Sequence, residues 1–104
     1  MQTDAEALAV FDGHSLSYTY DVGLAVTNVF KGADRHTEFG GQELIEVVTV
    51  KNVAPNTYFV IWEDAERGIG SMTINLETKA VCTAITMDGE IAVMPGTITA
   101  FEKS

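Results

Sequence analysis

The side chains best suited to hold a small molecule are the three tyrosines and the single tryptophan, which lie in two short segments. Tyr18 and Tyr20 are two positions apart in the first segment, and Tyr58 and Trp62 are four positions apart in the second. Successive side chains of a β-strand point to opposite faces, so the members of each pair share a face. Aromatic walls with a few polar groups are typical of small-ligand sites, and a ligand carboxylate or phenol could bond the buried hydroxyls. The alternative is that these rings fill a core and extend their polar tips to solvent.

Two polar residues are further candidates for the site. Asp64 follows Trp62 by two positions, where burial beside the indole would raise its pKa and fit it for general acid or base chemistry. The alternative is that Asp64 caps the turn at residues 65–68, within a run of acidic residues. Asn28 interrupts an apolar alternating face, so it either orients a ligand or faces water. The predicted ligand-binding residues are therefore Tyr18, Tyr20, Trp62 and Asp64, with Tyr58 and Asn28 as second choices.

The other reactive residue types are too few or too scattered for metal or nucleophilic chemistry. His14 and His36 are the only histidines and lack ligand spacing, so surface or turn positions are expected and no metal site is predicted. Cys82 has no charged residue within two positions, so it is expected as a small buried side chain and not as a nucleophile. The sequence has no phosphate-binding glycine loop and no serine nucleophile motif, and we expect no cofactor.

Length and charge limit the class of protein. The 104 residues fit one small domain, in which residues 1–10 are expected to form a loose segment or one helical turn and residues 11–104 the barrel. Six basic and fifteen acidic residues give a formal charge of −9, so we expect no nucleic acid partner and no docking on an anionic membrane. The apolar runs are far shorter than the ~20 residues that span a bilayer. A single cysteine cannot form an internal disulfide, and we expect a cytoplasmic protein.

Alternation of polar and apolar residues predicts strands through most of the chain. The predicted strands cover residues 15–22, 24–31, 43–53, 57–64, 69–76, 80–87 and 90–101, and residues 35–42 are expected as a short irregular strand or a loop. Short turns between them make neighbouring strands antiparallel. An up-and-down barrel removes exposed strand edges, so we expect an all-β antiparallel barrel of seven or eight strands in preference to a sandwich.

Two motifs resemble segments of known families. Residues 13–23, GHSLSYTYDVG, resemble the first strand and turn of bacterial phenolic acid decarboxylases, and residues 58–64, YFVIWED, resemble their tryptophan-containing strand. The second segment, continued through residues 72–76 and 96–98, also resembles the MoaF-like proteins. Both groups form calycin (lipocalin-like) barrels, and the resemblance implies that fold for this chain.

The resemblance also implies roles for individual residues. In the decarboxylases, two tyrosines and an arginine hold the substrate carboxylate and a glutamate assists the phenol chemistry. Tyr18 and Tyr20 match the tyrosines, and Asp64 stands in the place of the glutamate. Residues 40–42, in the region that matches the arginine, include no basic residue, and Arg35 lies several residues early. We therefore expect a MoaF-like barrel that binds a small aromatic or apolar molecule, with a cofactor-free lyase or a filled-core interaction module as alternatives.

An outward apolar patch is also predicted. Phe59 and Ile61 alternate with the inward aromatic residues, so they point away from a barrel interior, beside Val47 or Thr49. Two-fold homo-oligomers are the commonest assemblies, so we expect a homodimer through the Phe59/Ile61 face. The competing interpretation is that the N-terminal segment folds over this face.

Overall fold

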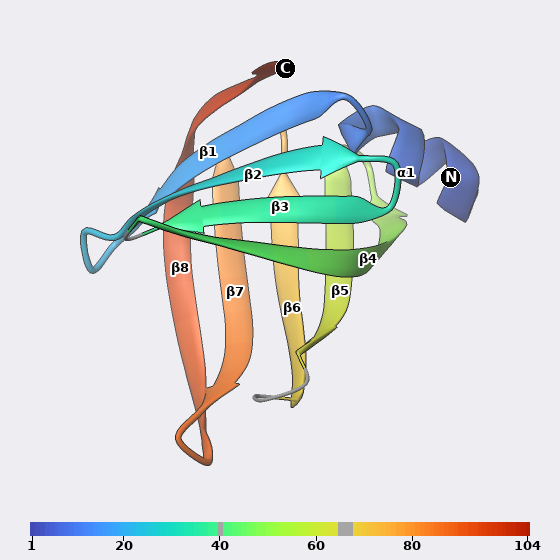
Figure 1. Ribbon diagram of the computed structural model, residues 1–104. Coiled ribbons are helices and arrows are strands. Elements are labelled where there is room, and N and C mark those ends of the chain that lie inside the picture. The colour runs from blue at the N-terminus through green and yellow to red at the C-terminus, as the bar shows by residue number, and fades with distance from the viewer. Residues whose placement is uncertain (40, 65–67) are drawn as a thin grey trace.

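The computed structural model of the protein describes residues 1–39, 41–64 and 68–104, and the side chains within these ranges except those of Phe39, Asp64 and Met87. Each strand pairs antiparallel with the next, and the last pairs with the first (Figure 1). This closed up-and-down arrangement confirms the all-β antiparallel barrel that the alternation predicts, and it matches the small calycin-like barrel that the resemblance implies. The elements are α1 (Asp4–Phe11), β1 (His14–Tyr20), β2 (Ala25–Lys31), β3 (Asp34–Phe39), β4 (Gln42–Ala54), β5 (Thr57–Asp64), β6 (Gly68–Asn75), β7 (Ala80–Met87) and β8 (Glu90–Lys103).

The barrel has two halves that cross at a steep angle, with β1–β4 in front of β5–β8 in Figure 1. Strand β4 joins the halves: residues 42–47 pair with β3, whereas the pairing with β5 begins at Val48. On the other side, β8 closes the barrel against β1, and a Cβ added at Gly96 would lie 2.7 Å from the Thr19 carbonyl oxygen. Glycine at position 96 therefore allows the two backbones to approach this closely.

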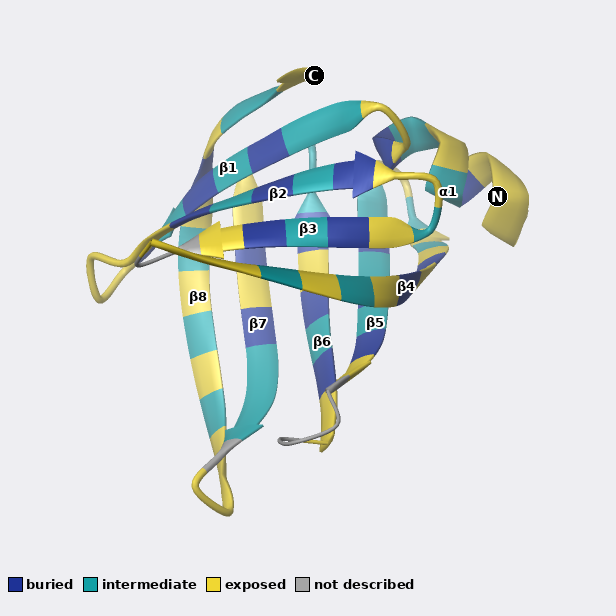
Figure 2. Ribbon diagram, viewed as in Figure 1, coloured by how far each residue is buried: buried dark blue, intermediate teal, exposed yellow. Residues whose placement is uncertain are grey.

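Burial alternates along the strands, as Figure 2 shows by its bands of buried and exposed residues. Tyr18 and Tyr20 point into the barrel, as do Tyr58 and Trp62, so each aromatic pair shares the interior face. Val22, at the end of the strand predicted for residues 15–22, is 80% exposed because β1 ends at Tyr20 and the chain turns. The interior also holds apolar side chains from all of β1, β2, β4, β5, β6, β7 and β8, namely Leu16, Val26, Phe30, Val48, Val50, Val60, Met72, Ile74, Val81 and Ile98.

Strand β3 differs from the expectation that residues 35–42 form a short irregular strand or a loop. Strand β3 is regular and pairs along its length with both β2 and β4. Its inward residues are Arg35 and Thr37, which are polar, so the two-residue period is present but carries no apolar signal. Hydrophobic alternation fails to identify a strand whose inward face is polar.

The N-terminal helix is longer than the single turn expected. Thr3 caps α1 with a capping box, in which the Thr3 hydroxyl accepts from Glu6 N at 3.2 Å and Glu6 Oε1 accepts from Thr3 N at 2.9 Å. The helix packs on β4 and β1, and Asp4 pairs with Lys51 at 2.9 Å. No described helix has the length and apolar character needed to cross a membrane.

Helix α1 inserts Phe11 into one end of the barrel. The Phe11 ring lies 5.2 Å from Phe30, 5.2 Å from Tyr58 and 5.6 Å from Phe101, measured between ring centroids. These four side chains form what we call the aromatic cluster. It fills the helix end of the barrel with ring-to-ring contacts.

Candidate functional site

A second group of side chains, which we call the polar cluster, lies inside the barrel. Its members come from five consecutive strands, so pairing of neighbouring strands brings them together: Arg35 pairs with Glu46, and Asn28 with Thr37. Arg35 is only 3% exposed, which is rare for an arginine and requires compensating contacts. The polar cluster consists of Tyr18 on β1, Asn28 on β2, Arg35 and Thr37 on β3, Glu46 on β4 and Trp62 on β5.

Three hydrogen bonds connect four of these residues in a chain. Arg35 Nη2 donates to Glu46 Oε1 at 2.8 Å, and the Thr37 hydroxyl donates to the same oxygen at 3.2 Å. Asn28 Nδ2 in turn donates to Thr37 Oγ1 at 3.0 Å. The Glu46 side chain is 12% exposed, so the arginine and the carboxylate neutralise one another where little water reaches them.

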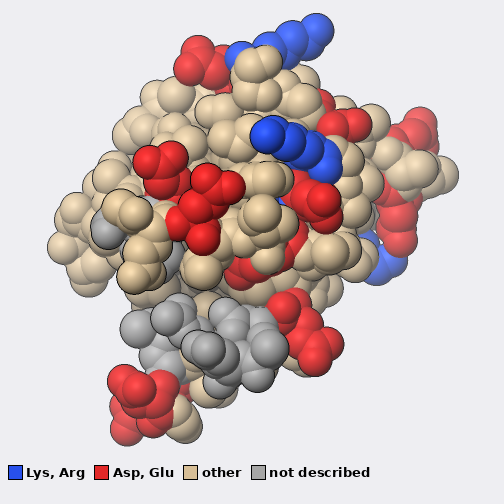
Figure 3. All heavy atoms as spheres, viewed as in Figure 1, with Lys and Arg blue, Asp and Glu red and all other residues tan. Residues whose placement is uncertain are grey.

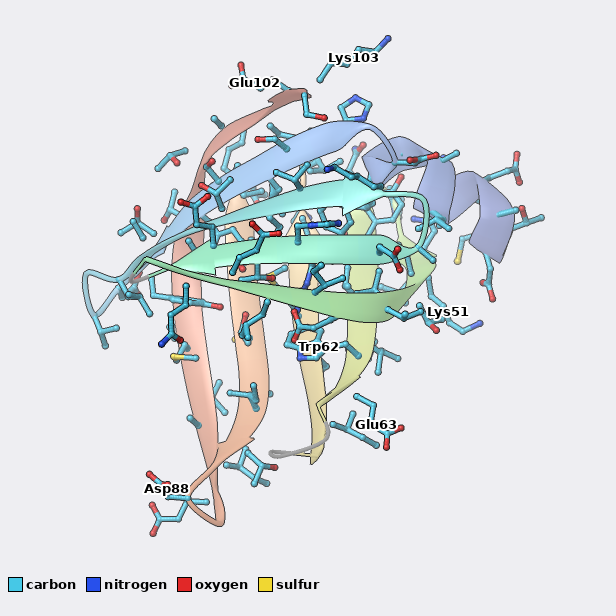
Figure 4. The ribbon with its side chains drawn as sticks, in the orientation of Figure 1. Lys51, Trp62, Glu63, Asp88, Glu102 and Lys103 are labelled. Atoms are coloured by element: carbon cyan, nitrogen blue, oxygen red, sulfur yellow. The ribbon has the colours of Figure 1, made fainter. Side chains whose placement is uncertain are left out.

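The Trp62 indole is held between the arginine and a glycine. Arg35 Cζ lies 3.8 Å from the ring centroid, in cation–π geometry. Gly70 pairs with Trp62 across β5 and β6, and a Cβ added there would lie 2.4 Å from the indole. The ring therefore occupies the space that any other residue at position 70 would fill. Figure 4 shows Trp62 beside β4 and β6, whereas Glu63 points away from the barrel.

Three buried polar atoms of this cluster have no hydrogen-bond partner among the described residues. They are the donors Arg35 Nε and Trp62 Nε1 and the acceptor Asn28 Oδ1. A buried group left without a partner costs about 1–3 kcal/mol, so native proteins normally satisfy such groups with protein, water or ligand. The polar cluster thus offers two unused donors and one unused acceptor to whatever enters the interior.

Of the two tyrosines of β1, Tyr18 belongs to the polar cluster and Tyr20 adjoins it. Tyr20 donates its hydroxyl to Thr83 Oγ1 at 2.7 Å, and its ring meets Tyr18 edge-on at 5.3 Å. Burial, and secondarily the neighbouring Tyr20, raise the pKa of Tyr18, while Arg35 and Asn28 act in the opposite direction. Tyr18 is therefore a neutral phenol at any physiological pH and can donate a hydrogen bond there.

The structure separates the predicted binding residues into two places. Tyr18, Trp62 and Asn28 belong to the polar cluster, and Tyr20 adjoins it through Tyr18. Tyr58 lies instead in the aromatic cluster and donates its hydroxyl to Gln2 Oε1 at 2.8 Å. The side chain of Asp64 lies outside the described residues.

The expectations for histidine and cysteine have different outcomes. His14 stacks on Phe101 at 5.0 Å, and the partly exposed His36 pairs with exposed Glu43 at 3.0 Å. Among the described residues, no group of three or more His, Cys, Asp or Glu side chains is placed to hold a metal. The expectation that Cys82 is buried is wrong. The inward residues of β7 include Val81 and Thr83, so Cys82 between them points outward and its thiol is exposed.

Sequence reasoning missed Arg35, Thr37 and Glu46. The comparison of motifs found no basic residue in the region that matches the decarboxylase arginine, but β3 is a regular strand and turns Arg35 inward. One signal could have found it: a hairpin that reverses at Gly40-Gly41 pairs Arg35 with Glu46, and that is the observed register. Opposite charges directly across such a pair favour one another, which supports the same register.

A hollow of about 480 Å³ reaches this cluster from outside. It lies where β4 leaves β5, because the two strands pair only from Val48 onward. Its rim is mainly apolar, and the two inward side chains at its wall are Glu46 and Trp62. The remaining lining residues are Ile45, Val47, Thr49, Ile61, Glu63 and Ile69.

Comparison with known proteins supports the fold alone. The chain matches no protein-family model and no curated protein. Among solved structures, it is similar to a crystal structure described as that of a "putative beta-lactamase from Burkholderia vietnamiensis". The TM-score is 0.79 at 21% sequence identity, and the match covers 86% of this chain and 94% of the other. The chain therefore shares a small β-barrel architecture with that protein.

Proposed function

We propose that this protein is a MoaF-like calycin barrel that binds a small aromatic or largely apolar molecule in its interior, beside the polar cluster. The observation that carries the proposal is the set of unpaired buried atoms, Arg35 Nε, Trp62 Nε1 and Asn28 Oδ1. Fixed unpaired donors around aromatic walls are what a binding site for an oxygen-bearing small molecule requires. A core that served packing alone would gain stability by replacing them with apolar groups.

The donors and acceptor define the chemistry of the ligand. An oxygen acceptor such as a carboxylate, carbonyl or phenol could accept from Arg35 Nε and Trp62 Nε1, and a ligand hydroxyl could donate to Asn28 Oδ1. The neutral Tyr18 hydroxyl adds a donor near the same place. Tyr18 and Tyr20 supply ring faces and edges for an aromatic body. Binding requires no metal or organic cofactor.

The hollow beside Trp62 gives the ligand a route to this cluster. Its apolar rim would desolvate the body of an aromatic molecule before the polar end meets Glu46 and Trp62. With its single cysteine, the chain has no internal disulfide to lose in a reducing compartment, and we propose the cytoplasm as its location.

The first test is a titration monitored by the fluorescence of the only tryptophan. We would titrate hydroxylated aromatic acids, the corresponding alcohols, and hydrocarbons of equal size that lack oxygen. Saturable quenching by the oxygen-bearing compounds alone is expected, because only they satisfy the buried donors. Absorbance recorded in parallel distinguishes binding from turnover, and loss of the substrate band would establish a lyase instead. Absence of saturable quenching across the panel would contradict the proposal and favour a filled core.

Matched variants identify the binding residues. Tyr18→Phe is expected to weaken binding by about 0.5–3 kcal/mol, the range for one buried hydrogen bond. Tyr58→Phe removes the same atom from a residue of the aromatic cluster and is the control, with unchanged affinity expected. Equal effects of the two variants would contradict the assignment of Tyr18 to the site.

A further inference from the structure

The outer face of the β5–β8 half is nearly free of charge. Segments 59–63, 69–73, 82–86 and 91–97 contain one charged residue, Glu63, in a chain with 21 acidic and basic residues. Three large apolar side chains of this face are well exposed, with Ile69 at 67%, Ile91 at 76% and Val93 at 62%. Phe59 and Ile61 lie beside them and are partly exposed. Contiguous apolar surface of this kind usually marks an interaction site.

Strand pairing makes this face continuous. Ile61 pairs with Ser71, Ser71 with Ala84, and Ala84 with Val93, so one row of uncharged side chains crosses all four strands. The neighbouring row runs from Phe59 through Thr73 and Cys82 to Pro95 and is also uncharged. The β1–β4 half differs, because residues 34–46 alone contain three exposed acidic side chains, those of Asp34, Glu38 and Glu43. Figure 3, which views that half, shows acidic groups distributed over its surface.

We propose that this β5–β8 face binds the same face of a second copy of the chain. The formal charge of −9 makes two copies repel one another over most of their surfaces. The β5–β8 face is where that repulsion is weakest and where apolar surface is available for burial. A basic partner would instead approach the acidic β3–β4 side. Two uncharged sheets of the same shape can pack face to face at about 10 Å.

The size of the face predicts a weak dimer. With strands about 4.8 Å apart and about 3.3 Å per residue, four strands of eight residues cover roughly 500 Å² per copy. Two copies would then bury about 1,000 Å², which is the lower limit for a specific interface. We therefore expect dissociation in the micromolar range and a dimer that strengthens as salt screens the like charges.

Sedimentation velocity over a series of protein and salt concentrations tests this proposal. The wild-type chain is expected to pass from monomer to dimer with rising concentration, and at lower concentration when salt is added. Val93→Lys is expected to weaken the dimer at least tenfold, although it lowers the net negative charge, because it places an ammonium group in an apolar contact. Val22→Lys makes the same change at an exposed, isolated position of the β1–β2 turn and is expected to dimerise like wild type.

The exposed thiol of Cys82 supplies a second readout within the face. Its rate of modification by a thiol reagent is expected to fall as wild-type protein is concentrated and to stay constant in Val93→Lys. Circular dichroism checks that both variants are folded. A monomer at all concentrations with a constant Cys82 rate would overturn the proposal, as would a dimer that Val93→Lys leaves intact.

Discussion

The aromatic cluster and the polar cluster lie in the same barrel but differ in how completely their buried polar groups are paired. Around Phe11, four rings meet at 5–6 Å and the one hydroxyl group, that of Tyr58, has a partner in Gln2. Around Arg35, buried polar groups are joined by hydrogen bonds, yet three atoms stay unpaired. In the first arrangement the hydroxyl group is paired. In the second, two donors and one acceptor are buried without partners, which lowers the stability of the fold. The contrast indicates that the helix end holds the fold, and it supports the proposal that the polar cluster serves binding.

Removal of Phe11 should have the largest effect on the fold. Phe11→Ala is expected to reduce the free energy of unfolding by about 3–5 kcal/mol, because it leaves a cavity among Phe30, Tyr58 and Phe101. Urea denaturation measures this, with Val22→Ala at the exposed turn as the control. The Phe11→Ala protein that remains folded should bind ligand with the same affinity as wild type. A loss below about 1 kcal/mol would show that α1 does not close the barrel in solution.

Disruption of the Arg35–Glu46 pair should separate stability from binding. Arg35→Met leaves the Glu46 carboxylate with little solvent and no cation, and should cost about 2–5 kcal/mol. The double variant Arg35→Met/Glu46→Leu should recover much of this loss, because two apolar side chains can pack without desolvated charge. Both variants should bind oxygen-bearing ligands poorly. Full binding by the stable double variant would refute the role of Arg35 as a ligand donor.

Displacement of the Trp62 ring should have an intermediate effect. Gly70→Ala places a Cβ within 2.4 Å of the indole, so the ring must leave its position under Arg35. We expect a loss of about 1–3 kcal/mol and a red-shifted tryptophan emission as the indole meets water. Ser71→Ala, on the outward side of the same strand, is the control. An unshifted emission spectrum in Gly70→Ala would contradict the packing described for Trp62.

The smallest expected effect is a dependence of stability on alkaline pH. The folded state raises the pKa of Tyr18 above its ordinary value of 10.0, so it holds the phenol proton more tightly than the unfolded chain does. The stabilisation that comes from this tighter proton binding is complete below pH 10. It is lost as the pH rises above 10, and the free energy of unfolding falls by at most about 1.4 kcal/mol per pH unit. Tyr18→Phe should remove that component of the slope in urea titrations between pH 9 and 11. The same slope in wild type and variant would contradict the burial of the hydroxyl.

The fold could be predicted from the sequence where inward side chains are apolar. The alternation in residues 57–64 and 80–87 located β5 and β7 at their observed bounds, and it placed Trp62 inside the barrel. The alternation did not identify β3, because its inward residues are an arginine and a threonine and hydrophobic patterning assigns such polar residues to loops. The same residues form the centre of the polar cluster, so the part of the site that departs from a packing core is the part that hydrophobic patterning cannot detect.

Closure of the barrel through β1 and β8 determines when folding can be completed. Residues 14–20 pair with residues 96–103, so the ring of hydrogen bonds stays open until the last strand has been synthesised. Joining segments about 80 residues apart costs about 4 kcal/mol of loop entropy, which makes this the slow step of a topology otherwise built from neighbouring hairpins. Until Gly96 docks against Thr19, β1 and β8 keep free edges, and chains in that state are the ones that chaperones or strand addition would capture.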